Sequence, residues 1–265
     1  MISDTAGQSD DTGRFIPDIL YEDNHVIVVN KPAGMLTQAD AGGRISLLEH
    51  LKNYIKIRDS KPGNVYMGMV QRLDKPISGL LVFGKTSKGA KRISEQIRNR
   101  QLTKCYIAVT AAGTESDSIS DDKTGDWREF THRLYRKKDK SLVDNEAEGA
   151  QAATLQLKTL LTNSDFSFHI IRLITGRKHQ IRAQLAALGM QICGDKKYGS
   201  QTQIDGNRIL LHSYLLRMTH PTRETEVEFI CSPPEVLLAL FSSHEQDQIN
   251  SVLGACRDNS PSPAL

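Results

Sequence analysis

The sequence predicts an α+β fold, in which a mixed and mostly antiparallel sheet is flanked by helices. Three observations favour this class. Short apolar runs bounded by Gly, Pro or polar turns recur along the chain, as is typical of strands. Segments 152–161 and 168–174, separated by a short polar turn, have the pattern of a β-hairpin. Only a few segments, such as 47–57, space their apolar residues as an amphipathic helix does.

The chain has 265 residues, of which 38% are hydrophobic, so it can bury a sizeable core as one domain or as two closely packed lobes. We expect a disordered tail over 1–16, the folded domain over 17–242 and a frayed tail over 243–265. No apolar run approaches the roughly 20 residues that span a bilayer. The polar N-terminus lacks a secretory signal. The four cysteines are far apart, which predicts reduced thiols in a cytoplasmic protein.

The first third of the chain alternates strands with one helix. The run Val26–Val29 predicts a buried strand that ends at Lys31-Pro32-Ala33-Gly34. Ser46 and Glu49 match a capping box, and apolar residues then repeat at helical spacing. The run Leu80–Phe83 predicts another buried strand.

The remainder continues this alternation. A helix capped by Thr86 or Ser87 is followed by a strand over 104–110. Residues 111–149 lose the apolar pattern, which indicates a poorly packed insertion with a strand or two. After the hairpin, Thr175 is a credible N-cap of a helix. The apolar stripe of that helix would be Ile181, Leu185 and Leu188. Two strands, near 210–213 and 225–230, and a short helix over 235–241 complete the expected elements.

The positive charge is concentrated in two segments. Residues 85–104 contain seven Lys or Arg residues against Glu95, and residues 171–198 contain six against Asp195. The formal net charge of the whole chain is only +3, so the rest of the chain is net acidic. Such asymmetry suggests an anionic partner, with nucleic acid as the first candidate. The alternative is that both segments form ordinary solvated helix faces.

The run Arg72-Leu73-Asp74 is a candidate reactive segment. If Leu73 points into the core of an extended segment, Arg72 and Asp74 share the other face. A guanidinium beside a carboxylate keeps the carboxylate ionised and restricts its orientation. An ionised carboxylate at the mouth of a strand suits a nucleophile or a general base. The alternative is a structural ion pair that caps the following turn.

Several enzyme classes lack their signature in this sequence. A glycosidase would need two paired carboxylates. The eight histidines show no metal-ligand spacing, and neither a P-loop nor a G-x-G-x-x-G loop occurs. We therefore expect no metal and no cofactor. One ionised aspartate among basic segments suits attack on, or deprotonation of, a polyanionic substrate.

Six motifs in order resemble the signatures of the RluA-type pseudouridine synthases. The three longest are Arg72–Leu80, Thr175–Arg182 and Gly194–Gly199. The shorter ones are Lys31-Pro32-Ala33-Gly34, Lys104-Cys105-Tyr106, and Leu211-His212-Ser213 with His220-Pro221. The resemblance extends over roughly Ile19 to Pro234. It implies the pseudouridine synthase fold, with an active-site cleft across the sheet.

The resemblance implies isomerisation of a specific uridine to pseudouridine in structured RNA, either rRNA or tRNA, without a cofactor. Asp74 would be the catalytic aspartate, Arg182 would keep it ionised, and Tyr106 would stack against the target base. Arg72 would fill the space of the flipped-out uridine or hold the neighbouring backbone. The other expected RNA contacts are Lys31, which could instead reach another loop, and Arg177, His179 and Gln180.

Two positions depart from the family pattern. Gln71 stands where the family usually has His, and Ile77 stands where it usually has Thr. Gln71 can donate hydrogen bonds but cannot titrate near neutrality. Because the segment before Phe15 is short, we expect this chain to lack the S4-like module that many members carry.

Two other functions are considered. One is an RNA-binding or RNA-folding factor of the same fold with little catalysis, which would not need Asp74, Tyr106 and Arg182 together. The other is an aspartate-nucleophile hydrolase of small substrates, which the basic segments disfavour. We expect a monomer that binds RNA, with no membrane and no obligate protein partner.

Overall fold

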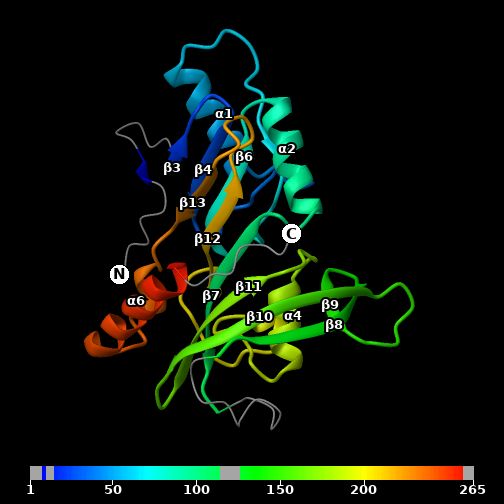
Figure 1. Ribbon diagram of the computed structural model, residues 1–265, viewed down its shortest axis with the longest axis vertical. Helices are drawn as coiled ribbons and strands as arrows, with labels where there is room; N and C mark the ends of the chain where they lie inside the picture. The colour runs from blue at the N-terminus through cyan, green and yellow to red at the C-terminus, as the bar shows by residue number, and fades with distance from the viewer. Residues whose placement is uncertain (1–7, 10–14, 114–125, 259–265) are drawn as a thin grey trace. The chain divides into compact units, whose positions relative to one another are not determined.

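Two compact units make up the protein. The computed structural model describes residues 8–9, 15–113 and 126–258 (Figure 1). Unit 1 comprises Met1–Leu102, Gly206–Arg208 and His212–Ser232, and unit 2 comprises Thr103–Asp205, Ile209–Leu211 and Pro233–Leu265. Composition allowed either one domain or two lobes, and the chain divides into two units.

Unit 1 is built on a mixed sheet. Its strands lie in the order β3 (Asp18–Glu22), β4 (Val26–Lys31), β6 (Ser78–Gly84) and β12 (Leu211–Thr219, of which His212 onward belongs to this unit). The short β5 (Gly68–Met69) pairs with β6, and β13 (Glu226–Ile230) pairs with β12. Only the pairing of β6 with β12 is parallel among these described strands. A separate two-stranded sheet joins β1 (Gln8–Ser9) to β2 (Phe15–Ile16).

The central strands of unit 1 are apolar on both faces. All seven residues of β6 are buried, and Val26–Val29 of β4 are fully buried. A strand covered on both sides reads as a continuous apolar run, which is how the sequence predicted these two strands. Helix α2 (Ser87–Arg98) packs Ile93 against one face of them. Helix α1 (Leu47–Arg58) buries an apolar stripe of its own.

Both predicted helix caps in unit 1 are confirmed. The Ser46 hydroxyl accepts a hydrogen bond from the Glu49 amide at 3.4 Å, and the Glu49 carboxylate accepts one from the Ser46 amide at 2.9 Å. The Thr86 hydroxyl accepts a hydrogen bond from the Gly89 amide at 3.1 Å. These bonds satisfy amide groups that the first helical turn leaves without intrahelical partners.

The strands β6 and β12 approach each other closely at Gly79. Its φ of +106° lies in the region that favours glycine, and a Cβ there would lie 2.3 Å from the carbonyl oxygen of Ser213. Any other residue at position 79 would therefore push these two strands apart.

Unit 2 contains an antiparallel sheet with a helix on one face. The strand order is β7 (Thr103–Ala111), β11 (Phe166–Leu173), β10 (Gln151–Thr162), β8 (Arg128–Lys137) and β9 (Lys140–Val143). The predicted hairpin corresponds to β10 and β11, and the predicted insertion contains β8 and β9. Helix α4 (Gln180–Ala187) lies against β8 and β9 (Figure 1). The remaining elements are the 3-10 turn η1 (Lys196–Tyr198), α5 (Glu235–Leu238) and α6 (Ser243–Asp258).

The C-terminal segment differs from the expectation of a frayed tail. Helix α6 begins at Ser243, contacts β10, and buries Ile249 and Leu253. Ser242 and Glu245 form a reciprocal pair of hydrogen bonds at its start. This is a capping-box signal that was present in the sequence. An apolar stripe of two residues was too narrow to reveal the helix by periodicity.

The N-terminal segment also differs in part from the expected disordered tail, because β1 and β2 pair with each other. Residues 1–7 and 10–14 lie outside the described residues. Within the described ranges, no helix is long and apolar enough to cross a membrane.

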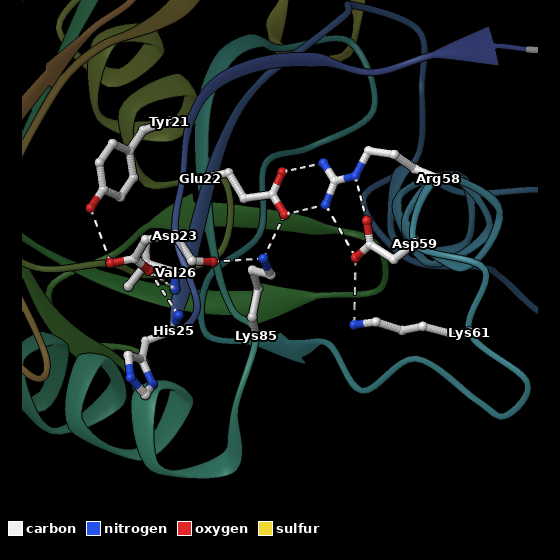
Figure 2. Close-up of polar contacts among 9 residues, drawn as sticks. All are labelled: Tyr21, Glu22, Asp23, His25, Val26, Arg58, Asp59, Lys61 and Lys85. Atoms are coloured by element: carbon white, nitrogen blue, oxygen red, sulfur yellow. Dashed lines mark hydrogen bonds and ion pairs between the residues drawn. The ribbon is translucent and has the colours of Figure 1, made fainter.

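A polar network holds the turn between β3 and β4 (Figure 2). The Asp23 carboxylate accepts hydrogen bonds from the amides of His25 and Val26, both at 2.8 Å, and from the Tyr21 hydroxyl at 3.1 Å. The Nε2 of His220 lies 2.8 Å from the same carboxylate. Burial acts to raise the pKa of Asp23, but these hydrogen bonds outweigh it and lower the pKa to about 2.

We predict that Asp23→Asn lowers the melting temperature at neutral pH and flattens the pH dependence of stability in acid. A carboxyl whose folded-state pKa is depressed contributes stability above its unfolded pKa, usually 3.8, and loses it as the pH falls towards 2. Thermal melts between pH 2 and pH 7 measure this. Asp205→Asn, which changes an exposed turn carboxylate, is the control. If the melting temperature of Asp23→Asn falls between pH 4 and pH 2 as steeply as that of the wild type, the account is contradicted.

Candidate functional site

The Asp74 segment buries Leu73, as the sequence predicted. Leu73 is buried, whereas Asp74 is half-buried and Arg72 is exposed. A turn follows at once, because the Ile77 amide donates to the Asp74 carbonyl at 3.1 Å. Strand β6 then begins at Ser78. The carboxylate therefore lies at the entrance to a buried strand.

The loop 31–37 holds the residues on both sides of Asp74. The Thr37 hydroxyl donates to the Leu73 carbonyl at 2.9 Å and accepts from the Leu73 amide at 3.2 Å. The Gly34 amide donates to the Lys75 carbonyl at 2.8 Å. Because both neighbours are hydrogen-bonded to one loop, the backbone on each side of Asp74 is fixed.

Lys31, the last residue of β4, is fully buried. Its ammonium donates to the carbonyls of Pro32 at 2.8 Å, Met35 at 2.9 Å and Lys75 at 3.2 Å. Burial lowers the pKa of Lys31 to about 7, and the charge of Asp74 acts in the opposite direction. The expectation that Lys31 contacts RNA is therefore wrong in this structure. The alternative, that Lys31 reaches another loop, is what the structure has.

Arg72 does not make the expected ion pair with Asp74. Its side chain extends into solvent and pairs with no residue in the part of the chain that the structure describes. The two residues do share the face opposite Leu73, but this geometry leaves the long guanidinium side chain free to turn away. The charge of Asp74 acts instead on the buried Lys31, whose pKa burial lowers and this charge raises.

A buried histidine fixes the far end of the turn. The Ser78 hydroxyl lies 2.9 Å from His212 Nδ1, and His212 Nε2 lies 3.1 Å from the Cys231 carbonyl. Burial lowers the pKa of His212 to about 4, although the Cys231 carbonyl acts to raise it. A neutral ring must donate from Nε2 to this carbonyl, so Nδ1 accepts the proton of Ser78.

Tyr106 lies in β7 of unit 2 and is buried. In the sheet it stands opposite Ile171, which in turn stands opposite Leu157. Residues directly opposite one another share a face of the sheet. Leu157 lies on the same face as Ala153, which packs against Ala183 of α4. Tyr106 is therefore on the side of the sheet that α4 covers.

Helix α4 begins later than predicted. Its N-cap residue is His179, in the left-handed conformation with φ of +53°, and Thr175 does not cap it. Instead the Thr175 hydroxyl donates to the Gln180 side-chain oxygen at 2.8 Å and accepts from the Thr154 amide at 2.9 Å. The loop 175–179 is thus closed by side-chain hydrogen bonds, which replace the expected first helical turn. Arg177 and Lys178 therefore lie in this loop and not in the helix.

The residues of this loop have different environments. The Gln180 side chain is buried. Its Oε1 accepts a hydrogen bond from the Arg177 backbone amide at 3.0 Å, and its Nε2 donates one to the Thr154 carbonyl at 3.0 Å. Gln180 therefore holds the loop and is not available to RNA, contrary to expectation. His179 is half-buried, with Nδ1 2.9 Å from the Tyr198 hydroxyl. Arg177 is exposed, and its Nε donates to the Ala152 carbonyl at 3.3 Å.

Arg182 is held in a buried ion pair. Its Nε and Nη2 donate to the two carboxylate oxygens of Asp195 at 2.7 and 2.8 Å. The guanidinium carbon lies 4.9 Å from the centre of the Tyr198 ring, whose hydroxyl is 3.0 Å from the Ser141 amide. Asp195 and Tyr198 were recognised only as part of a motif. Their role was not foreseen, although Asp195 is the one acidic residue of its basic segment.

The predicted site residues divide between the units. Asp74, Arg72 and Lys31 belong to unit 1, and the others belong to unit 2, namely Tyr106, Arg177, His179, Gln180 and Arg182. The pairing of Arg182 with Asp74 therefore stays a prediction. No group of three or more His, Cys, Asp or Glu side chains among the described residues is arranged to hold a metal ion.

Comparison with known proteins identifies the relatives of this chain. Residues 25–187 match the family model described as RNA pseudouridylate synthase. An uncharacterized RNA pseudouridine synthase of Bacillus subtilis, YlyB, is 32% identical over 228 residues, which are 85% of this chain and 72% of that protein. Ribosomal large subunit pseudouridine synthase C of Buchnera aphidicola is 29% identical over 224 residues, 79% of this chain and 64% of that protein.

A solved structure shares the fold. Human RNA Pseudouridylate Synthase Domain Containing 1 is 21% identical and superposes with a TM-score of 0.70. The match covers 94% of this chain and 97% of the human chain. The predicted α+β fold with a mixed, mostly antiparallel sheet is confirmed by this likeness and by the strands described above.

We predict that Asp195→Asn destabilises the protein by about 3 kcal/mol or more, because it breaks the buried ion pair between Asp195 and the Arg182 guanidinium. Urea unfolding at neutral pH measures the change. Asp139→Asn is the matched control. Asp139 pairs with Lys197 of η1, the turn that Asp195 precedes, but Asp139 is exposed. An exposed pair contributes little, so this control should unfold like the wild type. Equal effects of the two substitutions would contradict the prediction.

Proposed function

This chain belongs to the RNA pseudouridylate synthase family and isomerises uridine to pseudouridine in RNA, and we propose that Asp74 is the aspartate that carries the reaction. In this isomerisation the bond between C1′ of the ribose and N1 of the uracil breaks, the base turns, and C1′ bonds to C5. The proton that leaves C5 is balanced by the proton that N1 gains. The reaction therefore consumes no oxidant, reductant or second substrate.

The fixed position of Asp74 is the observation that supports this role most strongly. Leu73 and Lys75 are each hydrogen-bonded to the loop 31–37, so the backbone that carries the carboxylate is held in place before substrate arrives. The buried Lys31 ammonium adds an attractive charge. A positioned carboxylate serves both routes that remain open, attack on C1′ and removal of a sugar proton to form a glycal.

Two residues of unit 2 complete the proposed machinery. Tyr106 stacks against the uracil, and Arg182 pairs with Asp74 in the reacting complex. The orientation of Arg182 by Asp195 and the Tyr198 ring supports this role, because a guanidinium with little freedom pairs at a lower entropic cost.

Exposed basic groups supply the proposed contacts to the RNA backbone. Arg72 and Arg177 both carry exposed guanidinium groups, one in each unit. We propose ribosomal RNA as the substrate, because the Buchnera relative is named for the large ribosomal subunit. An RNA-folding factor without catalysis would not need a carboxylate fixed from both sides, so this alternative is not favoured.

We predict that Asp74→Asn lowers the single-turnover rate of pseudouridine formation by about a thousandfold or more without loss of RNA binding, because the reactive carboxylate is removed and the turn stays intact. The assay incubates the protein with an unmodified transcript of large-subunit ribosomal RNA. Pseudouridines are then mapped by chemical labelling and reverse-transcription stops.

Asp40→Asn is the matched control, since Asp40 is a carboxylate of the same unit whose partner is the exposed Arg44. It should give the wild-type pattern of stops. RNA binding by the wild type with no new stops would contradict the proposed activity. Stops that persist in Asp74→Asn would contradict the assignment of Asp74.

A further inference from the structure

Lys104 in unit 2 is a basic residue that has no counter-ion among the described residues. Lys104 is the second residue of β7, and its side chain is half-buried. Its ammonium forms no hydrogen bond or ion pair with any residue whose structure is described. Burial lowers the pKa of Lys104, as expected for a cation that leaves water without a partner.

The position of Lys104 relates it to the proposed base-stacking residue. Lys104 and Tyr106 are two residues apart in one strand, so their side chains share a face and their Cα atoms are about 7 Å apart. The Lys104 ammonium nitrogen would lie 3.5 Å from a Cβ placed on Gly176. Gly176 is exposed and begins the basic run that continues with Arg177 and Lys178.

A comparison with Lys31 shows why Lys104 does not serve the fold. The Lys31 ammonium has three backbone carbonyls as acceptors, so its burial is compensated by hydrogen bonds within the protein. Lys104 has no such acceptor in the described part of unit 2. A partly desolvated charge without a partner destabilises the folded state, and a bound anion would relieve that cost. Because Gly176 has no side chain, the loop leaves this side of the ammonium uncovered, whereas an added Cβ would already contact it.

We propose that Lys104 binds a backbone phosphate of the RNA next to the uridine that stacks on Tyr106. This inference deepens the proposed function and rests on it. The base and the phosphate of one nucleotide lie on opposite sides of its sugar. Tyr106 and Lys104, on one face of the strand, can therefore hold the base and the phosphate respectively. Lysine binds phosphate as a compact point charge. A phosphate contact sets the register of the strand without reading its sequence, so Lys104 is a positioning residue.

The test compares Lys104→Met with the wild type on an unmodified transcript of large-subunit ribosomal RNA. RNA affinity should fall about tenfold or more, as for loss of one charge-assisted contact. The slope of log K against log salt should decrease by about 0.7 to 0.9. The single-turnover rate at saturating RNA should not change. Lys104→Arg should restore both the affinity and the slope.

Lys158→Met is the matched control. Lys158 is a half-buried lysine of β10 in the same sheet, and it lies on the face opposite Leu157 and Tyr106. It should bind RNA like the wild type. Gly176→Leu is a second variant, which keeps the charge but covers the ammonium. It should weaken RNA binding as Lys104→Met does. If Lys104→Met fails to fold, the RNA affinity of Gly176→Leu tests the proposal.

Two results would overturn the proposal. One is wild-type affinity and salt slope in Lys104→Met, or in Gly176→Leu where Lys104→Met does not fold. The other is a lower single-turnover rate at unchanged affinity, which would assign Lys104 to the chemistry rather than to a phosphate. Binding can be measured in the Asp74→Asn background. If the wild type makes no pseudouridine but Lys104→Met weakens RNA binding, the proposed function is contradicted and the phosphate contact of Lys104 is not.

Discussion

The buried ammonium of Lys31 is the interaction on which the arrangement around Asp74 depends. It joins two carbonyls of its own loop to the carbonyl of Lys75, the residue beside Asp74. A buried carbonyl without a partner costs about 1–3 kcal/mol of folding stability. The hydrogen bonds from the ammonium to these three carbonyls therefore hold the loop 31–37 against the turn that follows Asp74. Thr37 secures the other neighbour of Asp74. The backbone on both sides of Asp74 is thus held by the loop 31–37.

Unit 2 positions its candidate site residues in a similar way. The Gln180 amide closes the loop before α4, and Asp195 with Tyr198 orients Arg182. In both units apolar strands supply the core, whereas buried polar groups with satisfied hydrogen bonds fix the geometry near the candidate site. Such groups allow few alternative arrangements, because each lost partner leaves a desolvated polar atom. Lys104 is the contrasting case, since its charge is left without a partner among the described residues.

The sequence predicted the elements that follow local rules. The fully apolar strands β4 and β6 and the capping box at Ser46 were recognisable, because each signal lies within a few residues. Long-range partners were not recognisable. Lys31 was assigned to RNA because its acceptor at Lys75 is far away in the chain, and the start of α4 was placed at Thr175 because the Gln180 side chain replaces the first turn. Gln71 remains unexplained, since its side chain makes no hydrogen bond within the described chain.

The link between Lys31 and Asp74 can be measured by NMR titration of protein labelled with ¹⁵N-lysine, with the Lys31 signal assigned by its loss in Lys31→Arg. The account predicts a pKa of about 7 for Lys31 in the folded protein, because burial disfavours its charged form. It also predicts a lower pKa in Asp74→Asn, because the carboxylate charge that raises it is gone. A Lys31 pKa near its ordinary 10.5, or one that Asp74→Asn leaves unchanged, would contradict the account.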